Sequence, residues 1–123
     1  MQLSAHFRSE EFRCRCGECG IVQIHPGVVI LLEQVRAHYG HRPVTVTSGC
    51  RCLKHNRKVG GAPHSKHLCS SKTLGAAADF SVAGVGPEDV FSFLDATYPG
   101  CLGLGLYASW VHADVRPDKA RWG

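Results

Sequence analysis

Three polar residues in the second half of the chain, His67, Asp79 and His112, have the chemistry of metal ligands. A catalytic zinc ion uses three protein ligands of the His and carboxylate type and leaves a fourth position open for water. Asp114 follows His112 by two residues on an expected strand, so both side chains should face the same pocket. Taken alone, a His or Asp on a strand is more often a hydrogen-bonded structural residue, and both interpretations stay open on spacing alone.

Seven cysteines are a second unusual feature of this short chain. Cys14, Cys16 and Cys19 form a Cys-x-Cys-x-x-Cys group, and Cys50 and Cys52 form a second group. An odd number leaves at least one cysteine unpaired within the chain, and without a signal peptide a complete disulfide framework is not expected. A structural zinc held by four of these thiolates, a disulfide between the two groups and plain buried thiols remain three alternatives.

Length and composition indicate one folded domain spanning residues 1–123. The chain is 44% hydrophobic and 20% charged, which argues against disorder. The net charge is +4, but Lys and Arg are scattered, so we expect no nucleic-acid partner. No apolar run reaches the roughly 20 residues that span a bilayer. Residues 1–12 lack the apolar segment of a signal peptide, so we expect a cytoplasmic protein as encoded, or one that leaves by another route.

Hydrophobic periodicity and turn residues predict an α+β fold, in which flanking helices cover a small, largely antiparallel sheet. Helices are expected at residues 26–40, 51–58 and 87–96, because Pro26 and Pro87 suit a first helical turn. Strands are expected at residues 44–47, 76–82, 102–107 and 110–115, with a hairpin joining the last two. Residues 59–74 are expected to form a loop.

The order of several short motifs resembles the zinc D-Ala-D-Ala carboxypeptidase family, whose fold is shared by the D-Ala-D-Ala dipeptidases and the Hedgehog signalling domain. The similarity runs along nearly the whole chain, which makes the set of motifs more specific than any one of them. The motifs are Leu3-Ser4-Ala5-His6-Phe7, Thr47-Ser48-Gly49-Cys50-Arg51, Ser65-Lys66-His67, Gly75-Ala76-Ala77-Ala78-Asp79 and Val111-His112-Ala113-Asp114.

The resemblance implies a role for each residue of the site. His67, Asp79 and His112 would bind the catalytic zinc, and Arg51 would bind a substrate carboxylate through its bidentate guanidinium group. Ser48 and His55 would support the substrate pocket. The alternative for Arg51 is a surface or structural role, and His55 can equally be a residue on a helix surface.

Asp114 would serve as the general base, because it is acidic, shares the strand face of His112 and stands in the matching motif. The dipeptidases instead use a Glu three residues before the last His, where this chain has Ser109, which cannot serve. The alternative role for Asp114 is to orient His112 or to pair with an Arg as a supporting carboxylate.

One departure from the family pattern concerns the spacing of the first two ligands. Eleven residues separate His67 from Asp79, where the family has six, so five residues around 69–73 are expected to be inserted. A surface loop tolerates such an insertion, although it could reshape the rim of the pocket. His64 is the rival ligand if the alignment shifts across the insertion.

The resemblance therefore implies a monomeric, endolysin-like zinc metallopeptidase. Its expected substrates are bacterial peptidoglycan stem peptides or cross-links, cut at D,D- or L,D-bonds by a carboxypeptidase or endopeptidase reaction. It would act on the cell wall after release or export, with one catalytic zinc and room for a second, structural zinc. The alternatives are a non-catalytic binding module of the Hedgehog kind and a structural protein that its zinc only stabilises.

Overall fold

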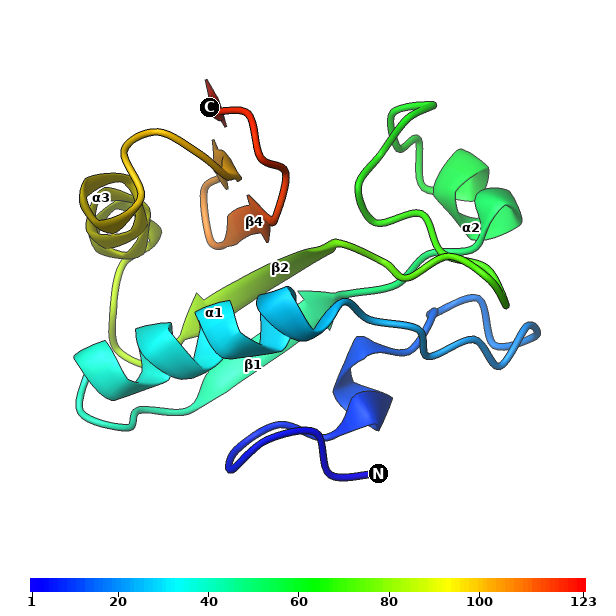
Figure 1. The fold of residues 1–123 in the computed structure, drawn as a ribbon, viewed down its shortest axis with the longest axis horizontal. Coiled ribbons are helices and arrows are strands. Elements are labelled where there is room, and N and C mark those ends of the chain that lie inside the picture. Colours follow the sequence, from blue (N-terminus) through cyan, green and yellow to red (C-terminus); the bar gives the residue numbers. More distant parts are fainter.

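A five-stranded sheet forms the centre of the computed structural model, which describes residues 1–123 (Figure 1). Its strand order is β1-β2-β4-β3-β5, and every neighbouring pair is antiparallel except β3 and β5. The strands are β1 (Val44–Ser48), β2 (Ala77–Val82), β3 (Gly103–Leu106), β4 (Val111–Asp114) and β5 (Ala120–Trp122). This arrangement confirms the predicted α+β fold with a largely antiparallel sheet.

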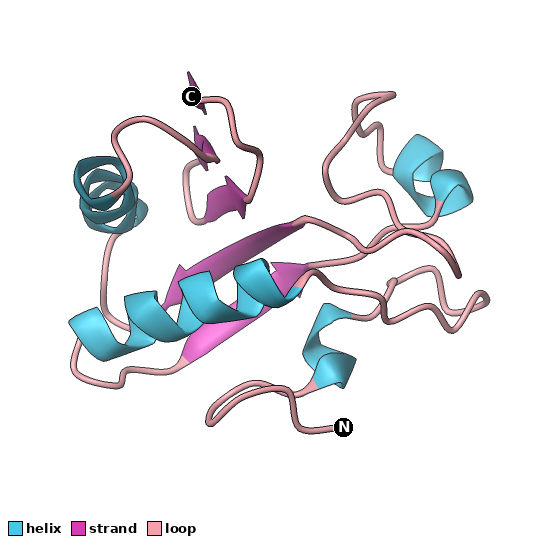
Figure 2. Ribbon diagram, in the orientation of Figure 1, coloured by secondary structure: helices cyan, strands magenta, loops and turns pink.

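The helices are α1 (Pro26–His38), α2 (Leu53–Lys58) and α3 (Pro87–Thr97), with a short 3-10 turn η1 at Ser9–Phe12. Helices α1 and α3 flank the sheet, whereas α2 lies apart from it, as Figure 2 shows. Pro26 begins α1, and the His25 side chain accepts a hydrogen bond from the Gly27 amide at 2.9 Å, which satisfies one free N–H of the first turn. α1 packs against β2 and α3 packs against β3, so these two helices bury their apolar sides on the sheet.

The hydrophobic core lies between α1, α3 and the sheet. Val28, Leu32 and Val35 point inward from α1, at the i, i+4 and i+7 positions of an amphipathic helix, and meet side chains such as Phe80 and Leu104. Only five buried residues are polar or charged, namely Ser9, Asn56, His67, His112 and Asp114. Burial of polar groups costs free energy unless they are hydrogen-bonded, so each of these residues needs partners within the fold.

The register between β2 and β4 brings two of the expected metal ligands together. Asp79 is the direct cross-strand partner of His112, and Ala77 is the partner of Asp114. Side chains at directly paired positions lie on the same face with Cβ atoms about 4.5–5.5 Å apart. On the neighbouring strand β3, a Cβ atom at Gly103 would lie only 2.3 Å from Asp114 Oδ2, so a glycine is needed beside that carboxylate.

The long loop between α2 and β2 supplies the third ligand, and its backbone is paired to the segment after β1. The Arg51 amide donates to the His67 carbonyl at 2.7 Å, and the Cys69 amide donates to the Arg51 carbonyl at 2.8 Å. Residues 70–73 make a tight turn, in which the Ser70 amide donates to the Thr73 carbonyl at 3.0 Å. The inserted residues therefore form a local turn and leave the backbone around His67 paired.

The fifth strand was not expected from the sequence. Residues 120–122 have no alternating pattern, and they become a strand because the free edge of β3 pairs with them in parallel. This pairing places Trp122 opposite Gly105, where a Cβ atom would lie 2.4 Å from the Trp122 ring.

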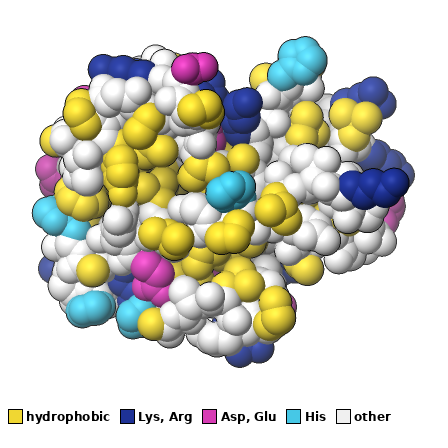
Figure 3. All heavy atoms as spheres, viewed as in Figure 1, with side chains coloured by type: hydrophobic (Ala, Val, Ile, Leu, Met, Phe, Trp, Pro, Cys, Tyr) yellow, Lys and Arg dark blue, Asp and Glu magenta, His cyan; other side chains and the backbone are white.

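The surface bears on two expectations about partners. No helix of the structure combines the length and the apolar run that crossing a membrane requires. Figure 3 shows that Lys and Arg side chains on the face over α1 lie mostly around its edge, while hydrophobic side chains occupy its middle. This face therefore lacks the continuous basic patch that is typical of a nucleic-acid interface.

The burial pattern of α1 predicts different outcomes for two neighbouring aliphatic residues. Leu32→Ala should lower the free energy of unfolding by about 2–5 kcal/mol, because Leu32 is fully buried and its removal leaves a cavity. The matched control Ile30→Ala should change it by about 0.5 kcal/mol or less, because Ile30 is 60% exposed. Urea unfolding at equal metal content measures both, and similar losses would contradict the described packing.

Candidate metal centre

Three ligand-type atoms converge from a loop and two strands. Oδ1 of Asp79 lies 3.2 Å from Nε2 of His67 and 2.9 Å from Nδ1 of His112, and the two ring nitrogens are 3.2 Å apart. Ligand atoms of a tetrahedral zinc ion, at about 2.0–2.1 Å from the metal, are about 3.3 Å from one another. The three atoms are therefore spaced as ligands of a single zinc ion.

The orientation of His67 leaves its Nε2 atom free to bind a metal. Its Nδ1 atom lies 2.7 Å from the Gly49 carbonyl oxygen, which can only accept a hydrogen bond. Nδ1 therefore carries the hydrogen, and Nε2 of the neutral ring presents its lone pair to the cluster. The residue is 2% exposed, so packing holds the ring in this orientation.

His112 is oriented in the same way by a carboxylate. Its Nε2 atom lies 2.8 Å from Oδ2 of Asp114, which leaves Nδ1 to face Asp79 and His67. Asp114 has no exposed surface, and its oxygens also accept from Nε and Nη2 of Arg116 at 2.7 and 2.8 Å and from the Gly103 amide at 3.1 Å. These contacts favour the second role that the sequence left open for Asp114, that of orienting His112.

The resulting cluster of lone pairs calls for a cation. Nδ1 of His67 and Nε2 of His112 both carry their hydrogens away from the cluster, so no hydrogen lies between His67 Nε2 and His112 Nδ1. A proton or a metal ion must therefore relieve the repulsion between their lone pairs. Burial opposes protonation of His112, but the hydrogen bonds and charges of Asp114 and Asp79 outweigh it and raise the pKa of His112. Burial likewise opposes ionisation of Asp79, yet hydrogen bonds from His112 and His67 hold its pKa well below the usual range.

The cluster forms one wall of a cleft of about 670 Å³. Tyr107, Trp110 and Trp122 line the cleft together with Arg51, Arg116 and the loop at residues 59–66. The Trp122 ring lies 5.1 Å from the His112 ring between centroids, and the Arg116 guanidinium lies 5.4 Å from the centre of the Trp122 ring. The metal site thus opens toward a space large enough for a peptide segment, bounded by aromatic and basic side chains.

Arg51 reaches the cleft, and it is held beside Asp79. Its Nη2 atom lies 3.4 Å from Asp79 Oδ2, its Nε donates to the Ser48 hydroxyl at 3.0 Å, and its Nη1 donates to Asn56 Oδ1 at 3.3 Å. Ser48 therefore supports Arg51 and is not among the cleft residues. His55 also lies outside the cleft, on α2, so the structure does not bring it to the expected substrate pocket.

The register across the insertion places His67 in the cluster and His64 outside it. His64 is exposed and lines the cleft, whereas His67 is buried between Asp79, His112 and Gly49. The inserted residues 69–73 do not line the cleft.

Sequence reasoning missed Trp122 and Arg116 as cleft residues. Arg116 follows Asp114 by two residues, just past the end of β4, and in extended chain this spacing puts both side chains on one face. That spacing is the signal that could have identified Arg116.

The cysteines divide differently from the two groups seen in the sequence. Cys50 forms a disulfide with Cys69 from the inserted segment, across 19 residues, and not with the first group. The sulfur atoms of Cys14, Cys16, Cys19 and Cys52 form a separate cluster, within 4.8 Å of one another. Cys101 is a free thiol outside this cluster.

Comparison with known proteins identifies the family to which the chain belongs. A family model described as Peptidase M15 matches residues 5–114, which include His67, Asp79, His112 and Asp114. A search of curated proteins finds no match to the chain. The family match covers most of the chain, and the α+β fold with its mostly antiparallel sheet is consistent with it. The chain therefore belongs to the peptidase M15 family.

Proposed function

We propose that the chain is a zinc metallopeptidase that hydrolyses peptide bonds in bacterial peptidoglycan stem peptides or cross-links, with residues 1–123 acting as one monomeric domain after release or export. The observation that carries the proposal is the convergence of His67 Nε2, Asp79 Oδ1 and His112 Nδ1 on the wall of an open cleft. When bound there, zinc polarises a substrate carbonyl and lowers the pKa of a water molecule.

Arg51 is the residue proposed to bind the free carboxylate of a stem peptide. An arginine has five N–H donors, and the contacts to Ser48, Asn56 and Asp79 use three of them. Nη1 and Nη2 each keep one donor for a substrate carboxylate. The three existing contacts fix the plane of the guanidinium group, so little side-chain entropy is lost when a substrate binds.

Asp114 is proposed to position His112 and not to accept a proton from water. A general base must come within about 2.6–3.2 Å of the proton that it removes, directly or through one water. Asp114 lies behind the His112 ring, with both oxygens engaged by His112, Arg116 and Gly103. Burial opposes its ionisation, but hydrogen bonds from His112 and Arg116 hold its pKa well below the usual range, which makes it a weak base.

His64 is then the proposed proton acceptor. Asp79 is the only carboxylate that lines the cleft, and it belongs to the metal cluster. His64 is the only imidazole on the cleft wall outside the cluster, and imidazole is the side chain most often used as a general base. His64 belongs to the loop at residues 59–66, all of which line the cleft.

A non-catalytic binding module is the second candidate function. The observation that favours it is the absence of a second carboxylate among the residues that line the cleft. In that case the zinc and the aromatic wall would bind a cell-wall peptide without cutting it. Product formation separates the two functions.

Zinc-dependent turnover is the test of the proposed function. Zinc-loaded protein should convert purified muropeptides into shorter products seen by mass spectrometry, chelation should abolish this, and added zinc should restore it. His67→Ala and His112→Ala should lose this zinc and the turnover, because three ligands hold the ion. His64→Gln is the matched control for metal content and should keep the zinc. Absence of products from protein with proven zinc at this site would favour the binding module.

Asp114→Asn should separate positioning from base catalysis. Loss of a supporting carboxylate typically lowers metal affinity about 10–100-fold, whereas loss of a general base lowers kcat by about 10²–10⁴. We expect weaker zinc binding with nearly normal kcat at saturating zinc. His64→Gln should show the reverse, with zinc retained and kcat reduced by about 10²–10⁴. A large loss of kcat in Asp114→Asn at saturating zinc, together with a normal His64→Gln, would return the base role to Asp114.

Arg51→Ala should weaken substrates that carry a free C-terminal carboxylate. The expected loss in kcat/KM corresponds to roughly 1.5–3 kcal/mol, the scale of a hydrogen bond to a charged group. Peptides with an amidated C-terminus should lose much less. The control Arg57→Ala changes an exposed arginine of α2 that does not line the cleft, and it should leave both substrates unaffected. Equal losses for the two substrates at unchanged zinc content would count against this role.

A further inference from the structure

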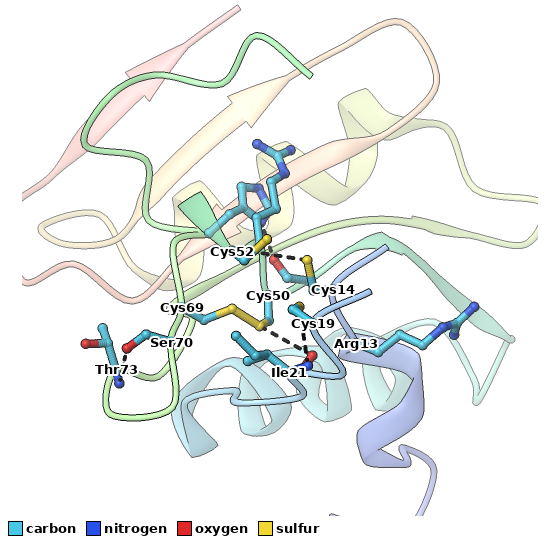
Figure 4. The surroundings of a disulfide bond; sticks show 12 residues. Arg13, Cys14, Cys19, Ile21, Cys50, Cys52, Cys69, Ser70 and Thr73 are labelled. Atoms are coloured by element: carbon cyan, nitrogen blue, oxygen red, sulfur yellow. Dashed lines mark hydrogen bonds between the residues drawn. A yellow bond between two sulfur atoms is a disulfide. The ribbon is translucent and has the colours of Figure 1, made fainter. Parts of the chain in front are cut away.

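We propose that Cys14, Cys16, Cys19 and Cys52 bind a second zinc ion as a tetrathiolate site. Their four sulfur atoms lie within 4.8 Å of one another, and none of them is in a disulfide. Four sulfurs around a tetrahedral zinc ion, at about 2.3 Å from the metal, are about 3.8 Å apart. Figure 4 shows Cys14 and Cys52 facing each other, beside Cys19 and the Cys50–Cys69 disulfide.

Backbone N–H groups surround these sulfurs in the way that thiolate ligands require. Cys16 Sγ accepts from the amides of Glu18 and Cys19, both at 3.3 Å. Each of the other three sulfurs accepts one hydrogen bond from a backbone amide, at 3.3–3.4 Å. The Cys52 amide donates to Cys14 Sγ, the Ile21 amide to Cys19 Sγ and the His55 amide to Cys52 Sγ. Such donors orient metal ligands and stabilise negative charge on sulfur, and here every one of the four sulfurs has at least one.

The local packing indicates why this segment needs a metal ion. The second core cluster of the molecule consists of Cys14, Cys50 and Cys69, with Cys16, Ile21 and Cys52 packed against it, so Ile21 is its only member that is not a cysteine. Residues 13–23 form no helix or strand, and Gly17 and Gly20 turn the chain with positive φ angles of 77° and 67°. Segments without an adequate apolar core commonly depend on a disulfide or a structural metal.

The cysteine site would connect the N-terminal loop to the peptidase cleft. Cys52 begins α2 as its N-cap residue, directly after Arg51, and Cys50 on the other side is held by the disulfide to Cys69. Arg51 in turn pairs through its backbone with His67 and Cys69. A zinc ion at Cys52 therefore fixes one side of the segment that presents Arg51, and the disulfide fixes the other.

Metal content measured on the full chain, purified without oxygen, added reductant or chelators so that the Cys50–Cys69 disulfide stays intact, tests the proposal. Native mass spectrometry and elemental analysis should find about two zinc ions per chain, one at each site. Cys16→Ser and Cys52→Ser should retain only one, and the control Cys101→Ser should keep both, because Cys101 lies outside the cluster. His112→Ala should lose the other zinc and keep the one bound by cysteines, so the two sites fail independently.

Thiol alkylation of the unmodified protein covers the case in which a cysteine variant does not fold. Cys14, Cys16, Cys19 and Cys52 should resist alkylation in the zinc-loaded chain and react together after chelation, while Cys101 should react to the same extent in both states. Cobalt substitution should give the intense near-ultraviolet thiolate-to-metal band in His112→Ala and not in Cys52→Ser. Disulfides among the four cysteines in freshly purified protein, or zinc content unaffected by both serine variants, would overturn the proposal.

Discussion

The carboxylate of Asp114 has no exposed surface and lies between the His112 ring and the Arg116 guanidinium. This contact determines which nitrogen of His112 carries a hydrogen, and therefore which nitrogen faces the cluster. The Gly49 carbonyl has the same effect on His67. A ligand site in which both imidazoles are fixed before the metal arrives loses less conformational entropy on binding, and the ion meets three lone pairs already at tetrahedral spacing.

Regular and irregular structure contribute differently to the site. The β2–β4 register places Asp79 opposite His112, and this pairing is as rigid as the sheet. His67 and Arg51 lie on segments without regular structure, so other contacts have to hold their side chains in position. Backbone pairing between these segments and the Cys50–Cys69 disulfide supply such contacts. The proposed tetrathiolate zinc at Cys52 would add a third on the other side of Arg51.

The features of the fold that the sequence predicted are those set by local periodicity. The stripe on α1, the β-branched strand β1 and the hairpin of β3 and β4 all follow from residue spacing, as does the inward face shared by His112 and Asp114. The family resemblance added the metal-ligand set and its order along the chain. Strand β5 was missed, because it forms by pairing with the edge of β3 and has no pattern of its own.

The contacts of Asp114 and the pairing of cysteines could not be predicted for a similar reason. Whether a carboxylate faces a cleft or the back of an imidazole depends on its partners in the fold, here Gly103 of β3 and Arg116 just after β4. Cys50 and Cys52 are separated by one residue, yet Cys50 pairs with Cys69 and Cys52 joins the cluster of Cys14, and nothing in their spacing distinguishes these two partners. The insertion obscured Cys69 as a partner, because it falls outside the family pattern.

The most direct measurement of the central claim is a crystal structure of the zinc-loaded protein, with anomalous scattering recorded on both sides of the zinc absorption edge. We predict a peak within about 2.0–2.2 Å of His67 Nε2, an Asp79 carboxylate oxygen and His112 Nδ1, with the Asp114 contact to His112 Nε2 retained. A zinc ion bound through His112 Nε2 or through His64, or the lack of any peak at this cluster in protein that turns over substrate, would contradict the account.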